Sequence, residues 1–299
     1  MKKLLVFAAL TCATSVQAQK VDTLASQELQ EVIVAGVRAQ KNAPFAVANI
    51  KKTELSNFSK TGRELPFLFA HTPGIFAWGD NGLGTGTAAM RIRGAGGSRI
   101  NITLDGVSLN SPEDQTVFWA NMNSYGALMS SVQIQRGIGT STNGDGAFGG
   151  SISLATATPN QQPSAEVSGS FGTYNTYNTG VKFSTGLLGN HFVFDGAYHE
   201  TATDGFLHGT AGRSGSYYGG LTYLGNNFQI RYKNIGNFEK TGQAWNGVVA
   251  GNNDASLMGS DIKTYKDLYE RGLGRFNPLY EGLMFDYDKW SFPTDANGK

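Results

Sequence analysis

The chain has 299 residues, with 24 basic and 23 acidic side chains and a formal net charge of +1. This near-neutral balance argues against a nucleic-acid partner held by bulk charge. A single cysteine excludes a disulfide scaffold, a cysteine-based zinc finger and an iron–sulfur site. The 40 glycines and the low charged fraction of 16% suggest an all-β secreted or outer-membrane protein.

The N-terminus has the organisation of a signal peptide. A basic start precedes an apolar run over residues 4–13, and the small residues Val16 and Ala18 fit a cleavage site after Ala18. The apolar run is too short to span a membrane, and a buried core helix is the alternative. Cleavage of residues 1–18 removes two lysines and Cys12, which leaves a net charge of −1 and no cysteine.

Residues 19–42 read as an N-terminal arm. A polar stretch over residues 19–30 leads into a short β-branched run, Glu31, Val32, Ile33 and Val34. Such an isolated run is either the first strand of a domain or a docking strand that adds to the edge of a partner's sheet. The polar sequence on both sides favours an accessible segment.

Residues 43–158 predict an α+β unit. Helices are expected at Lys52–Phe58 and Arg63–His71, with a third over Met122–Met129. Strands are expected at Ala89–Ile92, Ile100–Leu104, Val107–Leu109, Val132–Arg136 and Gly150–Leu154.

Glycine-rich turns separate these elements. Asp105-Gly106 lies between two apolar runs and predicts a two-residue hairpin, because a primed turn needs positive φ. The loops at 79–87, 94–97 and 137–150 contain the other turn glycines that we single out, Gly94, Gly137, Gly149 and Gly150.

Residues 164–235 alternate with period two, which predicts five strands. Phe228, Ile230 and Tyr232 share one face, for example, and the intervening residues are polar. Turns are expected at 173–176, 187–190 and 225–227, with a long loop over 201–215. The pattern is typical of an outer-membrane barrel meander, and a soluble β-sandwich alternates in the same way. Residues 237–299 show no strand period and read as a long loop with one helix near Lys263–Arg271.

A search for catalytic chemistry finds nothing. The chain has no phosphate-binding loop, no nucleophile elbow and no H-E-x-x-H motif, and its four histidines have no common metal spacing. We therefore predict no catalytic residue, no cofactor-binding residue and no metal ligand. The protein is expected to bind or move something without transforming it.

The residues resemble TonB-dependent receptors of the Gram-negative outer membrane, from Glu31 through at least Asn234. Each motif alone is weak, but six follow one another in the order of that family. They are Glu31-Val32-Ile33-Val34 at the position of the TonB box, Thr72-Pro73-Gly74-Ile75, Arg91-Ile92-Arg93-Gly94, Thr103-Leu104-Asp105-Gly106-Val107, Val132-Gln133-Ile134-Gln135-Arg136-Gly137 and Gly146-Ala147-Phe148-Gly149-Gly150-Ser151-Ile152. Residues 172–178 and 245–248 look most like receptors of the Bacteroidetes type.

The resemblance implies an α+β plug domain, a small mixed sheet with short helices over residues 43–158, followed by antiparallel transmembrane β-barrel strands over residues 159–299. It implies an exported protein of the outer membrane, in contact with lipid, that takes up a scarce nutrient and is no enzyme. Ferric siderophores, haem, cobalamin and oligosaccharides are all ligands of the family. The inner-membrane TonB complex would bind Glu31, Val32, Ile33 and Val34 by strand addition.

The resemblance also assigns roles to individual side chains. Arg91, Arg93 and Arg136 would form ion pairs with carboxylates of the barrel wall, with ordinary surface charge as the alternative. Gly94, Asp105, Gly106, Gly137, Gly149 and Gly150 would form plug turns. The family would point Trp78, Asn81, Gln115, Phe118 and Trp119 outward as ligand contacts, with packing against barrel loops as the alternative.

The chain departs from the family in length. A barrel of about 22 strands needs roughly 220 strand residues, and five strands cannot close. We therefore expect an incomplete barrel in a fragment of a receptor. A secreted β-rich binding or adhesion protein without energy coupling, and a non-functional receptor remnant, are the alternative functions.

Overall fold

A computed structural model describes residues 38, 39, 44, 46–86, 88–138, 147–160, 162–244, 264–270, 274, 275 and 277. The predicted signal peptide and the segment Glu31–Val34 lie outside these residues. No helix in the described part of the chain is long and apolar enough to cross a membrane.

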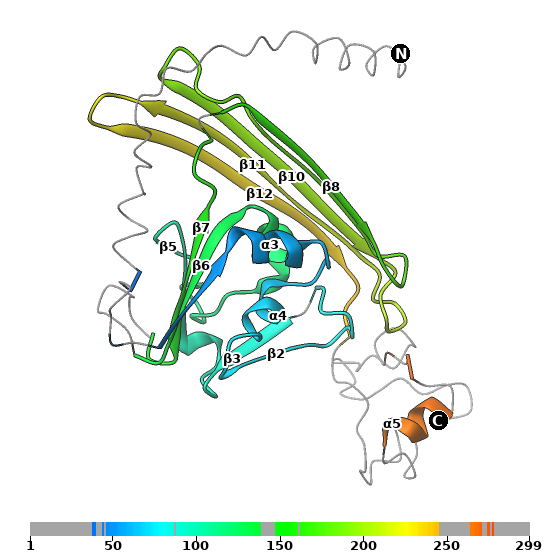
Figure 1. Ribbon diagram of the computed structural model, residues 1–299. Helices are drawn as coiled ribbons and strands as arrows, with labels where there is room; N and C mark the ends of the chain where they lie inside the picture. Colours follow the sequence, from blue (N-terminus) through cyan, green and yellow to red (C-terminus); the bar gives the residue numbers. More distant parts are fainter. Residues whose placement is uncertain are drawn as a thin grey trace, which may run out of the picture. The chain divides into compact units, whose positions relative to one another are not determined.

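A five-stranded sheet forms the centre of the first α+β unit (Figure 1). Its order is β1-β6-β7-β4-β5, with β4 and β7 parallel and the other pairs antiparallel. The strands are β1 (Ala46–Lys51), β4 (Ile100–Leu104), β5 (Val107–Ser108), β6 (Met129–Arg136) and β7 (Gly150–Thr156). A separate antiparallel pair joins β2 (Ile75–Gly79) to β3 (Ala88–Ile92).

Short helices cover this sheet. The predicted helices are confirmed as α3 (Lys52–Ser59) and the shorter α4 (Leu65–Phe69), in which Pro66 occupies the first turn, where its missing N–H costs no hydrogen bond. The prediction of a third helix over Met122–Met129 is wrong in bounds, because a 3-10 helix, η2 (Trp119–Ala127), forms instead. Its backbone leaves helical geometry at Met122, which has φ of −126°. A single 3-10 turn, η1 (Gly97–Arg99), precedes β4.

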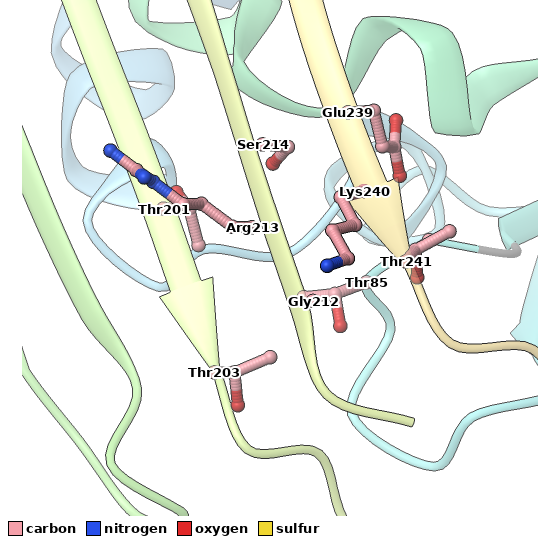
Figure 2. A pocket seen from close by; sticks show the side chains of 10 residues that line it. Thr85, Thr201, Thr203, Gly212, Arg213, Ser214, Glu239, Lys240 and Thr241 are labelled. Atoms are coloured by element: carbon pink, nitrogen blue, oxygen red, sulfur yellow. The ribbon is translucent and has the colours of Figure 1, made fainter. Parts of the chain in front are cut away.

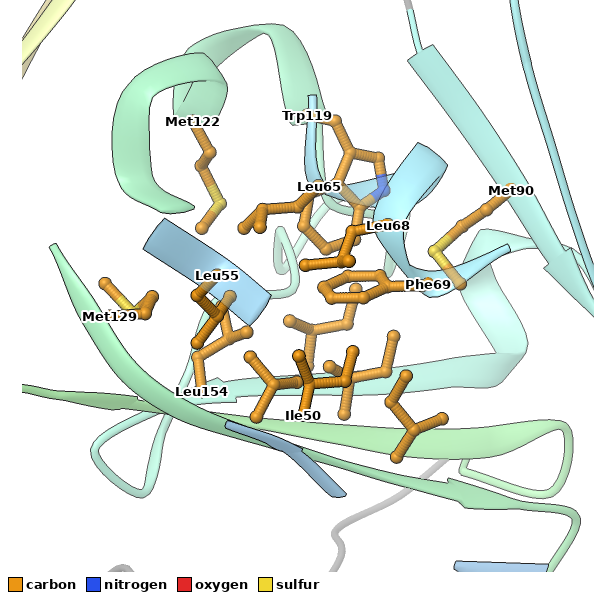
Figure 3. Close-up of a cluster of buried hydrophobic side chains, with 14 of the residues drawn as sticks. Ile50, Leu55, Leu65, Leu68, Phe69, Met90, Trp119, Met122, Met129 and Leu154 are labelled. Atoms are coloured by element: carbon orange, nitrogen blue, oxygen red, sulfur yellow. The ribbon is translucent and has the colours of Figure 1, made fainter. Parts of the chain in front are cut away.

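The hydrophobic core of this unit lies between the helices and the sheet (Figure 3). Leu55 of α3 and Phe69 of α4 are completely buried, and so is Leu154 of β7 beneath them. The Phe69 ring meets Trp119 edge-on, with 5.7 Å between ring centroids. The α+β unit therefore has an apolar interior of its own.

The second sheet consists of five antiparallel strands in sequence order: β8 (Ser164–Phe171), β9 (Tyr177–Ser184), β10 (Phe192–Thr203), β11 (Gly212–Leu224) and β12 (Gln229–Thr241). The predicted five strands are confirmed, and within the described residues they do not close into a barrel. The long loop predicted over 201–215 is wrong, because only residues 204–211 separate β10 from β11. The prediction that no strand lies beyond residue 237 is also wrong.

The two faces of this sheet differ in composition. One face exposes large apolar side chains along its length: Val167, Phe171, Val181, Phe183, Phe192, Phe194, Tyr198, Tyr217, Leu221, Ile230, Tyr232 and Phe238. The other face is buried and largely polar, with Ser216 and Thr222 fully inaccessible. We call the first the apolar face and the second the inner face. The predicted period-two alternation is thus confirmed.

Of the three remaining elements, two were not predicted and one was. β1 and β2 were not predicted, because β1 contains mostly small and polar residues and the apolar residues of β2 do not alternate with polar ones. The expected helix near Lys263–Arg271 is confirmed as α5 (Tyr265–Glu270).

Candidate functional site

The inner face of the second sheet contacts the first unit through polar groups, and an ion pair at Asp105 is the best defined of these contacts. Asp105 occupies the β4–β5 turn with φ of 49°, followed by Gly106 with φ of 84°. Its carboxylate accepts hydrogen bonds from the Thr156 N–H (2.9 Å) and hydroxyl (2.7 Å), and from Lys233 Nζ of β12 (2.9 Å). The predicted turn is confirmed, but nothing local in the sequence indicated the ion pair.

Arg231 binds the segment through which the chain passes from β7 to β8. Its Nη2 donates to the carbonyl oxygen of Ala157 and to the Tyr218 hydroxyl (2.8 Å). The same nitrogen lies 3.8 Å from the Asp195 carboxylate. Arg231 and Lys233 are therefore two basic side chains of β12 that fix this connection on the inner face.

Further contacts reach backbone carbonyl groups of α3 and η2. Asn178 Nδ2 donates to the Lys60 carbonyl at the end of α3 (2.9 Å), and Ser216 Oγ donates to Ser124 O of η2 (3.2 Å). Asn237 Nδ2 donates to Asn121 O (2.6 Å). The Lys60 carbonyl follows the last residue of α3 and lacks a partner within that helix, so Asn178 satisfies it.

The loop between β2 and β3 is organised by two buried polar side chains. Asn81 Oδ1 accepts hydrogen bonds from the N–H groups of residues 83–85, at 3.2–3.4 Å. The completely buried Glu64 accepts from the N–H groups of Gly86 and Ala88. Burial raises the pKa of the Glu64 carboxyl to about 7, against the opposing effect of these two N–H groups.

Glycine lets this loop approach the second sheet closely. Gly82 and Gly86 both have positive φ, and a Cβ atom at either position would clash. The clash would be with Phe206 at Gly82, at 2.7 Å, and with the Thr241 hydroxyl at Gly86. Any larger residue at these positions would push the loop away from the sheet.

A cavity of about 10 Å³ lies where this loop meets β10, β11 and β12 (Figure 2). Its lining is rich in hydroxyl groups, from Thr85 in the loop and from Thr201, Thr203, Ser214 and Thr241 on the strands. This volume holds about one water molecule. The cavity is therefore part of a packed contact and is too small for a nutrient.

The five predicted ligand contacts differ in accessibility. Asn81 is buried within its loop and Trp119 is buried against Phe69, which favours the packing interpretation for both. Phe118 and Gln115 are exposed, and Trp78 is partly exposed. Ligand contact stays a prediction for these three.

The three predicted ion-pairing arginines make other contacts within the described residues. Arg91 places its guanidinium 5.7 Å from the Trp78 ring, and Arg136 Nη1 donates to Pro73 O (2.6 Å). Arg93 has φ of 49° and is exposed. None of them pairs with a carboxylate of the five described strands, so pairing with a wall carboxylate stays a prediction.

The remaining turn glycines lie at bends around β3, β6 and β7. Gly94 and Gly137 have φ of 83° and 89°. A Cβ at Gly149 would lie 2.7 Å from the Arg99 carbonyl oxygen, and one at Gly150 would lie 2.6 Å from that of Gln135. Close backbone approach explains glycine at these last two positions.

Arg38, which the sequence analysis did not single out, binds the centre of the first sheet. Its guanidinium donates to Ser131 Oγ (2.9 Å) and O (3.2 Å) on β6, and to Ser153 Oγ (3.2 Å) and O (2.9 Å) on β7. The neighbouring Ala39 N–H donates to Gln133 Oε1 (2.6 Å). Burial lowers the pKa of Arg38, and the nearby Asp105 opposes this. The end of the arm is therefore fastened to two central strands.

Comparison with known proteins matches residues 39–151 to the TonB-dependent Receptor Plug Domain family. No curated protein matches the chain. Among solved structures, the chain is similar to FpvA of P. aeruginosa bound to a pyoverdine (TM-score 0.54, 17% identity, 68% of this chain and 27% of that one). It is also similar to the ferric yersiniabactin uptake receptor FyuA from Yersinia pestis (0.50, 15%, 63% and 30%) and to the copper transporter OprC (0.51, 13%, 62% and 29%).

These identities show the fold alone, and the chain spans about a third or less of the length of these receptors. TonB-dependent receptors are transporters of the Gram-negative outer membrane and not enzymes. The family match and the arrangement of the two sheets agree with the motif order in the sequence. Residues 39–151 therefore form a domain of the TonB-dependent Receptor Plug Domain family, and antiparallel strands of the barrel type follow it, which within the described residues are not closed into a barrel.

Proposed function

We propose that this chain belongs to an outer-membrane receptor that takes up a scarce nutrient with energy delivered through TonB. The observation that carries the proposal is the seating of the plug on the polar inner face of a sheet whose other face is apolar. That arrangement suits a protein surrounded by lipid with a hydrated interior. A secreted adhesion protein would have to cover the same apolar face, which is a large exposed patch in water.

The contacts between the plug and the second sheet (β8–β12), which we call the wall, suit a reversible rearrangement of the plug. They include hydrogen bonds and the Asp105–Lys233 ion pair, together with apolar packing of Tyr218, Ala197 and Ile235 against the plug core. A net contribution of about 1 kcal/mol for each such hydrogen bond is small, because water replaces the lost partner. A pull on the plug therefore breaks this interface at a lower cost than it unfolds the plug core.

The partner and the ligand follow from the same proposal. TonB binds Glu31, Val32, Ile33 and Val34 by strand addition, so that backbone hydrogen bonds supply the grip. Trp78, Gln115 and Phe118 are the proposed plug contacts to the ligand. Arg91, Arg93 and Arg136 pair with carboxylates of the completed wall. The ligand is a small nutrient such as a ferric siderophore, haem, cobalamin or an oligosaccharide.

Deletion of residues 31–34 from the gene in its own cells tests the proposal. Accumulation of radiolabelled ferric siderophores, haem and cobalamin is measured in energised cells, together with binding to cells at 4 °C. We expect the deletion to abolish accumulation of one probe while its binding remains. Deletion of residues 24–27 in the same arm is the matched control and leaves both unchanged. Unchanged accumulation without residues 31–34 would contradict energy coupling through this segment.

A further inference from the structure

The apolar face of the second sheet ends in charged residues at one end of the strands. Side chains two residues apart on a strand share a face, so Glu200 lies on the same face as Tyr198. Arg213 and Lys240 lie on this face as well, next to Phe238. These charges stand at the end of the sheet away from Arg231 and the connection from the plug.

Arg213 and Lys240 are directly opposite each other on β11 and β12 (Figure 2). Residues paired in this way have Cβ atoms about 5 Å apart, and two like charges at that distance repel each other. Lys240 is exposed and has no ion-pair partner among the described residues. The register therefore places two cationic residues at paired positions of the same exposed face.

The Arg213 guanidinium is held in one orientation. Its Nε and Nη2 donate to Glu200 Oε1 (2.7 Å) and Oε2 (3.0 Å), and its Cζ lies 5.8 Å from the Phe238 ring centroid. The hydroxyls of Tyr177 (3.1 Å) and Tyr198 (2.5 Å) donate to the same carboxylate. Glu200 is thereby saturated with donors, and it offsets only one of the two positive charges.

Donor capacity remains on both cations. The Arg213 side chain is 61% exposed, and its Nη1 has no hydrogen-bond partner in the described part of the chain. The Lys240 ammonium carries three further N–H donors. A guanidinium and the end of a flexible lysine on the neighbouring strand suit a tetrahedral oxyanion, since phosphate takes donors from both kinds of group.

We propose that Arg213 and Lys240 bind the phosphate of a membrane lipid headgroup. The inference rests on the outer-membrane location in the proposed function. The apolar side chains on the same face, Tyr198, Tyr217 and Phe238, are exposed next to the cations and would contact the acyl chains of the same lipid. Aromatic side chains are typical of the depth at which acyl chains meet headgroups. Free phosphate would gain the charge contacts without the apolar ones, so the site favours a lipid.

Lipid retention by the full chain tests this proposal. Protein is extracted from the membrane fraction in mild detergent and titrated with phosphatidic acid, or with diacylglycerol of the same acyl chains. Bound lipid is counted by native mass spectrometry. We expect phosphatidic acid to bind at least fivefold more tightly than diacylglycerol. Inorganic phosphate at the same concentration should not displace it.

Two double variants give the proposal its controls. R213Q/K240Q should lose the preference for phosphatidic acid, whereas K51Q/K52Q, which removes two exposed plug lysines, should keep it. R213K/K240R, which retains both charges, should keep most of it. If R213Q/K240Q does not fold by circular dichroism, the single variants R213Q and K240Q are compared in the same way.

The outcomes separate the two proposals. An unchanged preference in R213Q/K240Q, or displacement by inorganic phosphate, would overturn the lipid site and leave the proposed function intact. Absence of the protein from the membrane fraction would overturn both.

Discussion

The plug and the wall strands use the same sheet architecture in opposite ways. The plug sheet turns apolar side chains such as Ile134 and Leu154 toward its helices and builds a closed core. The wall sheet turns its large apolar side chains outward and keeps polar groups such as Ser216 inside. The plug therefore carries its own stability, whereas the wall depends on an apolar surrounding. The boundary between them contains the polar contacts of the inner face.

The largest expected loss of stability comes from a variant that creates a cavity in the plug core. Phe69→Ala should destabilise the plug by about 3–5 kcal/mol, because Phe69 is completely buried. Tyr232→Ala on the apolar face, which is 63% exposed, should cost less than about 1 kcal/mol in detergent. Pulse proteolysis of the full chain in urea measures both values. Equal losses would mean that the plug does not have an independent core.

A second test uses the buried Glu64. Its pKa in the folded plug, about 7, lies above the value of an exposed glutamate, so the folded state favours the protonated form. Protonated Glu64 makes its full contribution to the free energy of unfolding below about pH 4. This contribution, roughly 3 kcal/mol, is lost as the pH rises through 7. The urea concentration at the midpoint of plug unfolding should therefore decrease as the pH is raised from 5 to 8.

Glu64→Gln should reduce this dependence by the contribution of Glu64, even if one lost N–H contact lowers stability at every pH. Glu113→Gln, at an exposed position, should leave the slope as it is in the natural protein. A slope in Glu64→Gln as steep as in the natural protein would assign the pH dependence to another group.

Arg38 offers a third test, at the border of plug and arm. Arg38→Ala removes four hydrogen bonds to Ser131 and Ser153 and should cost about 2 kcal/mol. Hydrogen exchange of β6 and β7 amides should accelerate accordingly. Lys52→Ala, which removes an exposed cation of the plug, should not accelerate it. Unchanged exchange in Arg38→Ala would show that the arm is not fastened to these strands.

The smallest expected energy is that of the ion pair between the plug and the wall. Asp105→Asn and Lys233→Met should show a coupling energy of about 1 kcal/mol in a double-mutant cycle, as for a partly buried ion pair. Asp105→Asn combined with Lys240→Met, on the opposite face of β12, should show none. Denaturant unfolding of the four variants in each cycle gives the values.

Local chemistry explains which features the sequence predicts. The Asp105-Gly106 turn is readable because both residues favour positive φ, and the β8–β12 alternation is readable where Phe or Tyr alternates with polar residues. The ends of β10 and β11 were missed because small residues such as Ser214 and Gly215 remove the apolar contrast.

The candidate site was less predictable, because its contacts join distant segments. Lys233 and Asp105 are 128 residues apart, and Arg38 reaches strands more than 90 residues away. Asn81 and Trp119 lie in polar, glycine-rich or irregular sequence that looks exposed, yet the fold buries both. Resemblance to a family identified the plug, but only coordinates show which side chains hold it to the wall.

The attachment of Arg38 has a mechanical consequence. Within the described residues, β1 is the edge strand of the plug sheet and pairs with β6 alone, so a tension entering at Ala46 would separate six residue pairs in turn. Arg38 precedes β1 and grips β6 and β7 directly. A tension applied to the chain ahead of residue 38 is thus shared by the middle of the sheet before it reaches the edge. The order in which a pulling force reaches these contacts, and not only their number, determines which part of the plug unfolds first.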